Sequence, residues 1–98
     1  MTVSAGEIWL ADRGDESRRL VFVVSDARFH RLAERAVIAP VLDETPAVPR
    51  PWHVVFGGRT VAVSLLGTTA IDRLLECVDR AGFETLRQVR RAVQEITK

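Results

Sequence analysis

The stretch that decides the fold, "RRLVFVVSDARF" at residues 18–29, sets two arginines directly before a run of five apolar residues. The segment "LVFVVS" (20–25) is too short for a helix and rich in β-branched residues, so it predicts a strand buried on both faces. Asp26 follows as a possible N-cap, and "DARFHRLAE" predicts a short turn of helix after the strand. Two guanidinium groups would therefore stand at the start of a buried strand.

Two further strands flank this stretch. The segment "GEIWLAD" (6–12) alternates so that Ile8 and Leu10 share one face, which predicts a half-buried strand. The segment "RAVIAPV" (35–41) predicts another strand, with Pro40 near its end at an edge or bulge position.

The second half of the chain predicts a loop, a hairpin and two shorter strands. Three of the four prolines fall within residues 42–51, which must form a loop. "WHVVF" and "RTVAV" are separated by Gly57-Gly58, a hairpin turn of the type that needs positive φ. Residues 64–79 predict short strands interrupted at Gly67.

The C-terminal segment predicts an amphipathic helix. Apolar residues recur there at helical spacing, at Phe83, Leu86, Val89, Val93 and Ile96. A parallel sheet is not expected, because no helices of ten or more residues separate the strands. The pattern predicts a mainly β, α+β fold, a small barrel of short antiparallel strands with a C-terminal helix. With 98 residues and 47% apolar composition, the chain has enough material for one core, so residues 1–98 are expected to form a single domain.

Composition places limits on partners and compartment. The net charge of +1 gives no global attraction to nucleic acid or membrane, so any anion site must be local. Cys77 is the only cysteine, which excludes an intrachain disulfide and Cys-based zinc sets and fits a reducing cytoplasm. The N-terminus lacks a signal-peptide pattern, and no apolar run reaches the roughly 18 residues that a membrane span needs.

Several segments occur in the order typical of a known family. "GEIWLAD", an arginine before "LVFVVSDARF", then "VIAPV", "HVVF", "AID" and an amphipathic last helix resemble the MazF/PemK-like toxin endoribonucleases, from Gly6 to about Ile96. The resemblance implies an SH3-like barrel, a homodimer and neutralisation by a cognate antitoxin. It also implies cleavage of single-stranded RNA with no metal and no cofactor. Arg19 takes the place of the family's catalytic arginine, although Leu20 follows it in place of Pro, and Leu42 stands where the family has a catalytic Thr.

Metal-free RNA cleavage needs a base for the 2′-hydroxyl, a cation for the phosphate and an acid for the 5′-oxygen. Arg19 suits the second role because a guanidinium offers a planar fork of donors and stays charged, and Arg18 is the natural second clamp. The alternative is structural, with both arginines paired to Asp15 and Glu16.

The remaining candidates are the general base and the base-stacking residues. Imidazoles titrate near neutral pH, which makes His53 a candidate for proton transfer, whereas His30 is expected to be exposed. Glu44 lies just past the vacated Thr position and is a second candidate for catalysis. Trp9 and Trp52 would bind RNA by stacking on unpaired bases, unless they fill the core or a dimer interface.

Two other functions remain open at this point. The CcdB-like gyrase inhibitors share the fold, and a fold does not choose its target. Against that alternative, the chain ends Ile96-Thr97-Lys98 and lacks the C-terminal Trp-Gly-Ile that such toxins use. A non-catalytic family member that only binds its antitoxin or RNA is the third possibility.

Overall fold

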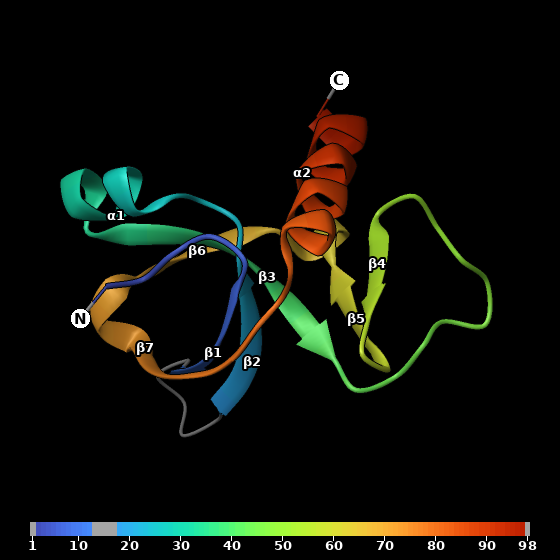
Figure 1. Ribbon diagram of the computed structural model, residues 1–98, viewed down its shortest axis with the longest axis horizontal. Helices are drawn as coiled ribbons and strands as arrows, with labels where there is room; N and C mark the ends of the chain where they lie inside the picture. Colours follow the sequence, from blue (N-terminus) through green and yellow to red (C-terminus); the bar gives the residue numbers. More distant parts are fainter. Residues whose placement is uncertain (1, 13–17, 98) are drawn as a thin grey trace.

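The computed structural model describes residues 2–12 and 18–97, and Figure 1 shows the arrangement of their elements. Within this part of the chain the strands are β1 (Glu7–Asp12), β2 (Arg18–Val23), β3 (Arg35–Leu42), β4 (His53–Phe56), β5 (Arg59–Ala62), β6 (Gly67–Ala70) and β7 (Leu74–Arg80). The helices are α1 (Ala27–Ala33) and α2 (Phe83–Thr97), with two short 3-10 turns, η1 (Val63–Leu65) and η2 (Ile71–Arg73). All strand pairings are antiparallel. The predicted mainly β fold with a C-terminal helix is confirmed.

The central strand β3 organises the sheet because it changes partner along its length. The strand order is β4-β5-β3-β2-β1-β7, and β6 pairs with β3 as well. On the side of β3 away from β2, residues 35–38 pair with β6 and residues 41–42 pair with β5. Pro40 lies between these two pairings, so on this side of β3 no strand pairs with it. The N–H group that proline lacks therefore costs little there. Of the two predicted positions for Pro40, an edge or a bulge, the edge is wrong because β3 is internal, and Pro40 lies instead at the interruption between the pairings with β6 and β5.

Strand β2 is buried on both faces, as predicted. Phe22 and Val24 belong to a core cluster that includes Val89 of α2, whereas Val21 and Val23 belong to a second cluster on the opposite face. Figure 1 shows α2 beside β4, with β1, β2 and β7 in the other half of the molecule, and residues of those three strands belong to the second cluster.

Strand β1 differs from its prediction. Ile8 joins the first cluster, but Trp9 and Ala11 on the other face are equally buried, in the second cluster. The face that the alternation assigned to solvent is covered because β1 lies between β2 and β7, and Leu74 of β7 joins the same cluster. The alternation predicts a half-buried strand, whereas the structure has residues of both faces of β1 in the core, with only Leu10 and Asp12 partly exposed.

Helix α1 begins at its predicted cap. The Asp26 carboxylate accepts hydrogen bonds from the backbone N–H groups of Arg28 and Phe29, at 2.9 and 3.1 Å. These bonds, that of Phe29 first, hold the pKa of Asp26 below its ordinary value, since they favour the charged carboxylate. Glu34 ends the helix in the left-handed conformation, with φ of 57°.

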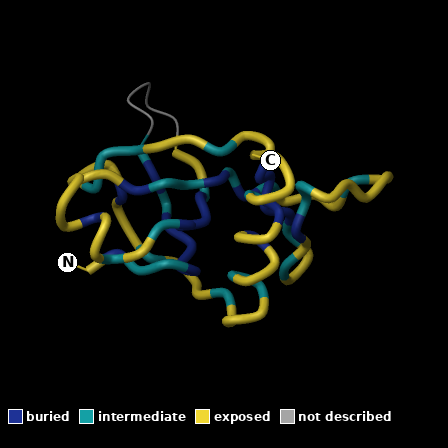
Figure 2. The backbone as a smooth tube through the Cα atoms, turned by 90° about the horizontal axis from the view of Figure 1, so that it is seen from above, coloured by how far each residue is buried: buried dark blue, intermediate teal, exposed yellow. Residues whose placement is uncertain are grey.

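The structure agrees with the prediction for the hairpin but not for the segment after it. Gly57 and Gly58 have φ of 55° and 79°, the positive values that the predicted turn requires. Gly67, however, begins β6 and does not interrupt a strand. The proline-containing loop before β4 extends away from the body of the molecule and is mostly exposed (Figure 2).

Helix α2 packs through the middle of its predicted apolar stripe. Val89 and Ala92 are buried, and Leu86 and Val93 pack against the same cluster. Phe83 at its first turn is 79% exposed. Its ring is therefore left on the surface. No helix among the described residues is long and apolar enough to cross a membrane.

Candidate anion-binding site at Arg19

The two arginines lie at the start of β2, where the ladder with β1 places them. Arg18 is opposite Asp12 and Arg19 is opposite Ala11. Both side chains are exposed although the strand continues directly into the core. The suggested partners Asp15 and Glu16 lie outside the described residues.

Arg19 lines a cavity of about 360 Å³ that opens at the end of the second core cluster, and we call it the Arg19 cavity. Arg35 from β3 and Arg73 from η2 line it as well. Its other walls come from four strands and η1, namely Ala11, Asp12, Val21, Ile38, Pro40, Leu65, Gly67, Thr68, Thr69 and Ala70. The structure thus places three arginines that are far apart in the sequence around one cavity, a lining suited to an anion.

Arg35 is held in place by the neighbouring strand. Its Nε and Nη2 atoms donate hydrogen bonds to the Thr68 hydroxyl oxygen, at 3.3 and 3.0 Å. The opposing register of β3 and β6, with Val37 opposite Thr68, brings the two side chains into reach. Because Thr68 accepts both bonds, its own O–H stays available to donate to a ligand.

Asp12 is the acidic residue among those that line the Arg19 cavity. It ends β1 and is partly buried. A carboxylate at the wall of an arginine-lined cavity can accept a proton from a bound hydroxyl group. Sequence reasoning missed Asp12, as it missed Arg35, Arg73 and the two threonines, because their approach depends on strand register and not on spacing along the chain.

Leu42 lies near this site but brings no hydroxyl to it. Val21 pairs with Pro40 in the antiparallel ladder, so Arg19, two residues before Val21, and Leu42, two residues after Pro40, lie at the same end of the strand pair. Opposite Leu42 stands Thr60, whose hydroxyl is engaged with the Glu44 carbonyl oxygen at 2.7 Å. The hydroxyl groups within the Arg19 cavity are those of Thr68 and Thr69 instead.

The structure does not bring His53, Glu44 or Trp52 to Arg19. His53 begins β4, and β5 and β3 separate that strand from β2 in the sheet. Its Nδ1 atom is buried without a hydrogen-bond partner among the described residues. Glu44 is exposed beyond the end of β3, and Trp52 packs partly buried against the first core cluster. Their predicted roles gain no support from position.

Trp9 is the one predicted RNA-binding residue whose environment excludes the expected contact. Its side chain is only 4% exposed, within the second core cluster. The indole N–H donates to the Glu7 carboxylate at 3.1 Å. A base cannot reach either face of the ring, so the interpretation of Trp9 as a stacking platform is wrong and its alternative, a core residue, is right.

His30 was expected to be exposed and is buried. Its Nδ1 lies 2.8 Å from the Val3 carbonyl oxygen, to which it donates. Its Nε2 lies 2.7 Å from the Ser25 hydroxyl, which also accepts the backbone N–H of Val37. Both ring nitrogens are thereby engaged, and the network ties the N-terminal segment to α1 and β3.

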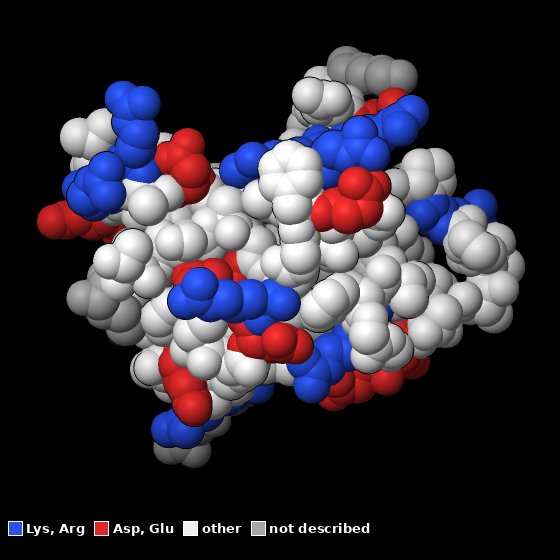
Figure 3. All heavy atoms as spheres, viewed as in Figure 1, with Lys and Arg blue, Asp and Glu red and all other residues white. Residues whose placement is uncertain are grey.

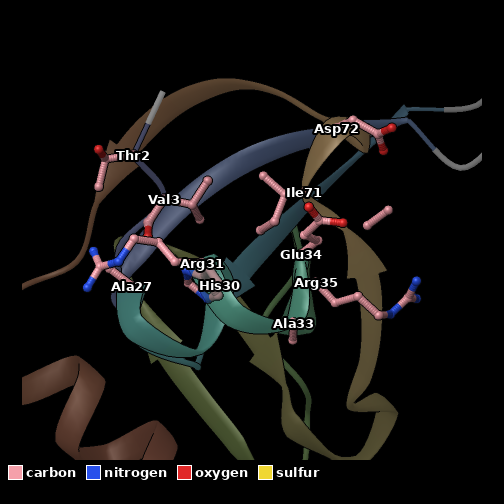
Figure 4. A pocket seen from close by; sticks show the side chains of 11 residues that line it. Thr2, Val3, Ala27, His30, Arg31, Ala33, Glu34, Arg35, Ile71 and Asp72 are labelled. Carbon is pink, nitrogen blue, oxygen red and sulfur yellow. The ribbon is translucent and has the colours of Figure 1, made fainter.

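A larger hollow of about 900 Å³ lies beside α1 (Figure 4), and we call it the α1 hollow. Its lining residues are Thr2, Val3, Ala27, His30, Arg31, Ala33, Glu34, Arg35, Ala70, Ile71 and Asp72. Two of these, Arg35 and Ala70, also line the Arg19 cavity.

The face of the molecule seen in Figure 3 is not broadly basic. Basic and acidic side chains are interspersed over the face seen in Figure 3, in keeping with the net charge of +1. Among the described residues, no group of three or more His, Cys, Asp or Glu side chains is placed to hold a metal ion.

Comparisons with known proteins agree on one family. The model of the PemK-like, MazF-like toxins of type II toxin–antitoxin systems matches residues 4–97. No curated protein sequence matches the chain significantly.

Solved structures show the same fold at low identity. A MazE–MazF complex from Deinococcus radiodurans superposes with a TM-score of 0.82 and 19% identity, over 98% of this chain and 96% of that one. A mycobacterial endoribonuclease in complex with its cognate antitoxin gives 0.80 and 18%, over 95% and 92%. The Mycobacterium tuberculosis toxin MazF-mt6 gives 0.73 and 11%, over 91% and 93%.

Proposed function

Because the chain belongs to the PemK-like, MazF-like toxins of type II toxin–antitoxin systems, we propose that it is an endoribonuclease that cleaves single-stranded RNA without a metal ion. One observation carries the proposal. Arg19, which the family resemblance places at the catalytic arginine, lines a cavity together with Arg35, Arg73 and Asp12. Such a cavity offers fixed positive charge for a phosphodiester and a proton acceptor beside it.

The proposed reaction assigns a role to each of these groups. Asp12 takes the proton of the 2′-hydroxyl, and the 2′-oxygen attacks the phosphorus. Arg19 and Arg73 stabilise the negative charge that builds on the non-bridging oxygens. The bond from phosphorus to the 5′-oxygen breaks, solvent water protonates that oxygen, and the products are a 2′,3′-cyclic phosphate and a 5′-hydroxyl end. Asp12 replaces His53 and Glu44 in this scheme because it lines the cavity and they do not.

The test is cleavage of single-stranded RNA by the purified protein in the presence of EDTA. We expect cut RNA bearing a 2′,3′-cyclic phosphate or its hydrolysed form. Asp12→Asn should abolish cleavage, whereas His53→Ala and Glu44→Ala should leave most of it. A gyrase supercoiling assay with the same preparation is the control. Intact RNA together with inhibited supercoiling would establish the gyrase alternative. Inactivity in both assays, with binding to the cognate antitoxin retained, would establish the non-catalytic one.

We also propose a homodimer, formed through β7. This strand lies at the end of the strand order, and its Leu75 and Val78 are 43% and 44% exposed. An edge strand that carries exposed apolar side chains needs a cover, which a second copy of the chain would supply. Sedimentation equilibrium at protein concentrations on the order of tens of micromolar should show a dimer, and Leu75→Arg should shift it to monomer. A monomer for the unmodified chain would contradict the proposal.

The same arginines would serve neutralisation by an antitoxin in the cytoplasm. A peptide with acidic and apolar residues can pair its carboxylates with the guanidinium of Arg19 in place of a phosphate. We expect Arg19→Ala to weaken the complex with the cognate antitoxin in calorimetric titration, and RNA to compete with that antitoxin. Unchanged affinity in the variant would remove Arg19 from the interface.

A further inference from the structure

The Arg19 cavity and the α1 hollow are neighbours that share two lining residues. Arg35 and Ala70 line both, so the two spaces lie on either side of one paired position, because Arg35 is opposite Ala70 in the ladder between β3 and β6. Arg35 therefore borders both spaces, and a phosphate bound to it would lie at the boundary between them.

Arg35 is suited to hold a charge at this junction. Its bonds to Thr68 use Nε and one hydrogen of Nη2, which leaves the other guanidinium hydrogens to donate elsewhere. A guanidinium already fixed by its neighbour loses less conformational freedom when it binds a phosphate.

The α1 hollow itself has the chemistry of a base-binding space. Val3 and Ile71 give it apolar walls, and the carboxylates of Glu34 and Asp72 lie on the side of Ile71, whereas Arg31 reaches to the opposite end (Figure 4). Carboxylates repel a phosphate but accept hydrogen bonds from the N–H groups of a base. His30 is buried in its own hydrogen-bond network and contributes no free group.

Glu34 has a left-handed backbone conformation that is most common for glycine. Its φ of 57° at the end of α1 lies in the region that glycine adopts without cost. This conformation ends α1, where the Glu34 backbone N–H donates to the His30 carbonyl oxygen at 2.9 Å, and it places Glu34 at the rim of the α1 hollow.

We propose that the α1 hollow binds the nucleotide next to the cleaved bond. Arg35 holds the phosphate that links this nucleotide to the one in the Arg19 cavity, and the carboxylates of Glu34 and Asp72 select its base. Guanine is the expected base because it presents two adjacent N–H donors that match the two oxygens of a carboxylate. This inference rests on the proposed function, since it assumes an RNA substrate in the Arg19 cavity.

The first experiment measures binding of an uncleavable oligonucleotide whose 2′-hydroxyls are replaced by hydrogen, so that cleavage plays no part. Arg35→Gln should weaken binding about tenfold. It should also lower the slope of log affinity against log salt by about 0.7, the value for one lost phosphate contact on a single strand. Arg91→Gln, a matched exposed arginine on α2, should change neither quantity. Equal effects of the two variants would overturn the inference.

The second experiment tests base selection with oligonucleotides that differ at one position. We expect Glu34→Gln and Asp72→Asn to reduce the preference for guanine at least fivefold, with little change for the other bases. An equal change for all bases, or none, would overturn the assignment of the α1 hollow. Reduced antitoxin affinity with unchanged RNA binding would also overturn it, in favour of a protein-binding surface. Intact base selection without any cleavage would instead reject only the proposed reaction.

Discussion

Arg19→Ala should reduce the rate of RNA cleavage in EDTA by about 10²–10³, the typical cost of removing one preorganised group that stabilises charge in the transition state. Arg19 stands on a strand whose next residues enter the core, so the ladder with β1 fixes the backbone position from which the guanidinium extends. Arg19→Lys should recover only part of the rate, because an ammonium keeps the charge but loses the planar fork. Single-turnover cleavage of a defined RNA measures both effects.

Arg18→Ala is the matched control for this prediction. Arg18 is the preceding residue on β2 and is also exposed, but it is not among the residues that line the Arg19 cavity. We therefore expect its loss to weaken RNA binding slightly at low salt and to leave the rate of the bound complex unchanged. A larger loss of rate for Arg18→Ala than for Arg19→Ala would place the scissile phosphate outside the Arg19 cavity.

Trp9→Ala should lower the free energy of unfolding by about 3–5 kcal/mol, the usual range for truncating a buried aromatic residue. That is a large share of the roughly 5–15 kcal/mol that stabilises a typical domain. The ring is 4% exposed in the second core cluster, so its removal leaves a cavity there. Urea denaturation followed by circular dichroism measures the change.

The variant Trp9→Phe distinguishes the contribution of the indole N–H to stability from the contribution of ring packing. The Glu7 carboxylate accepts the indole N–H at 3.1 Å and the Ser4 backbone N–H at 2.7 Å, and it pairs with Arg80 at 3.2 Å. Phenylalanine retains most of the packing and removes one of these three partners, so we expect a smaller loss, about 1–3 kcal/mol. RNA affinity of the folded Trp9→Phe variant should be unchanged. A tenfold loss of affinity at unchanged stability would restore Trp9 as an RNA-binding residue.

Local patterns predicted the elements well, because each depends on residues close together in the chain. The β-branched run at 20–25, the Asp26 cap and the Gly57-Gly58 turn act through backbone preferences and neighbouring hydrogen bonds. The order of these segments also carried the family resemblance, which the match to residues 4–97 confirms. The order of the segments also singled out Arg19 as a candidate site residue, and in the structure Arg19 lines a cavity.

The rest of the candidate site depends on the register of the strands and on which faces of each strand other elements cover. The alternating pattern along β1 assigned Ile8 and Trp9 to opposite faces of the strand. That both faces are buried depends on the packing of β7, which the pattern does not reveal. The partner change along β3 sets Arg35 beside Thr68 and, with η2, brings Arg73 to Arg19.

The sequence by itself determined the elements, the hairpin and the arginine at the start of a buried strand. Only the tertiary structure decided which side chains meet that arginine. The physical reason is that strand pairing joins residues through backbone hydrogen bonds that are nearly the same for every side chain, so a register is chosen by the packing of the whole core and not by the residues that it brings together.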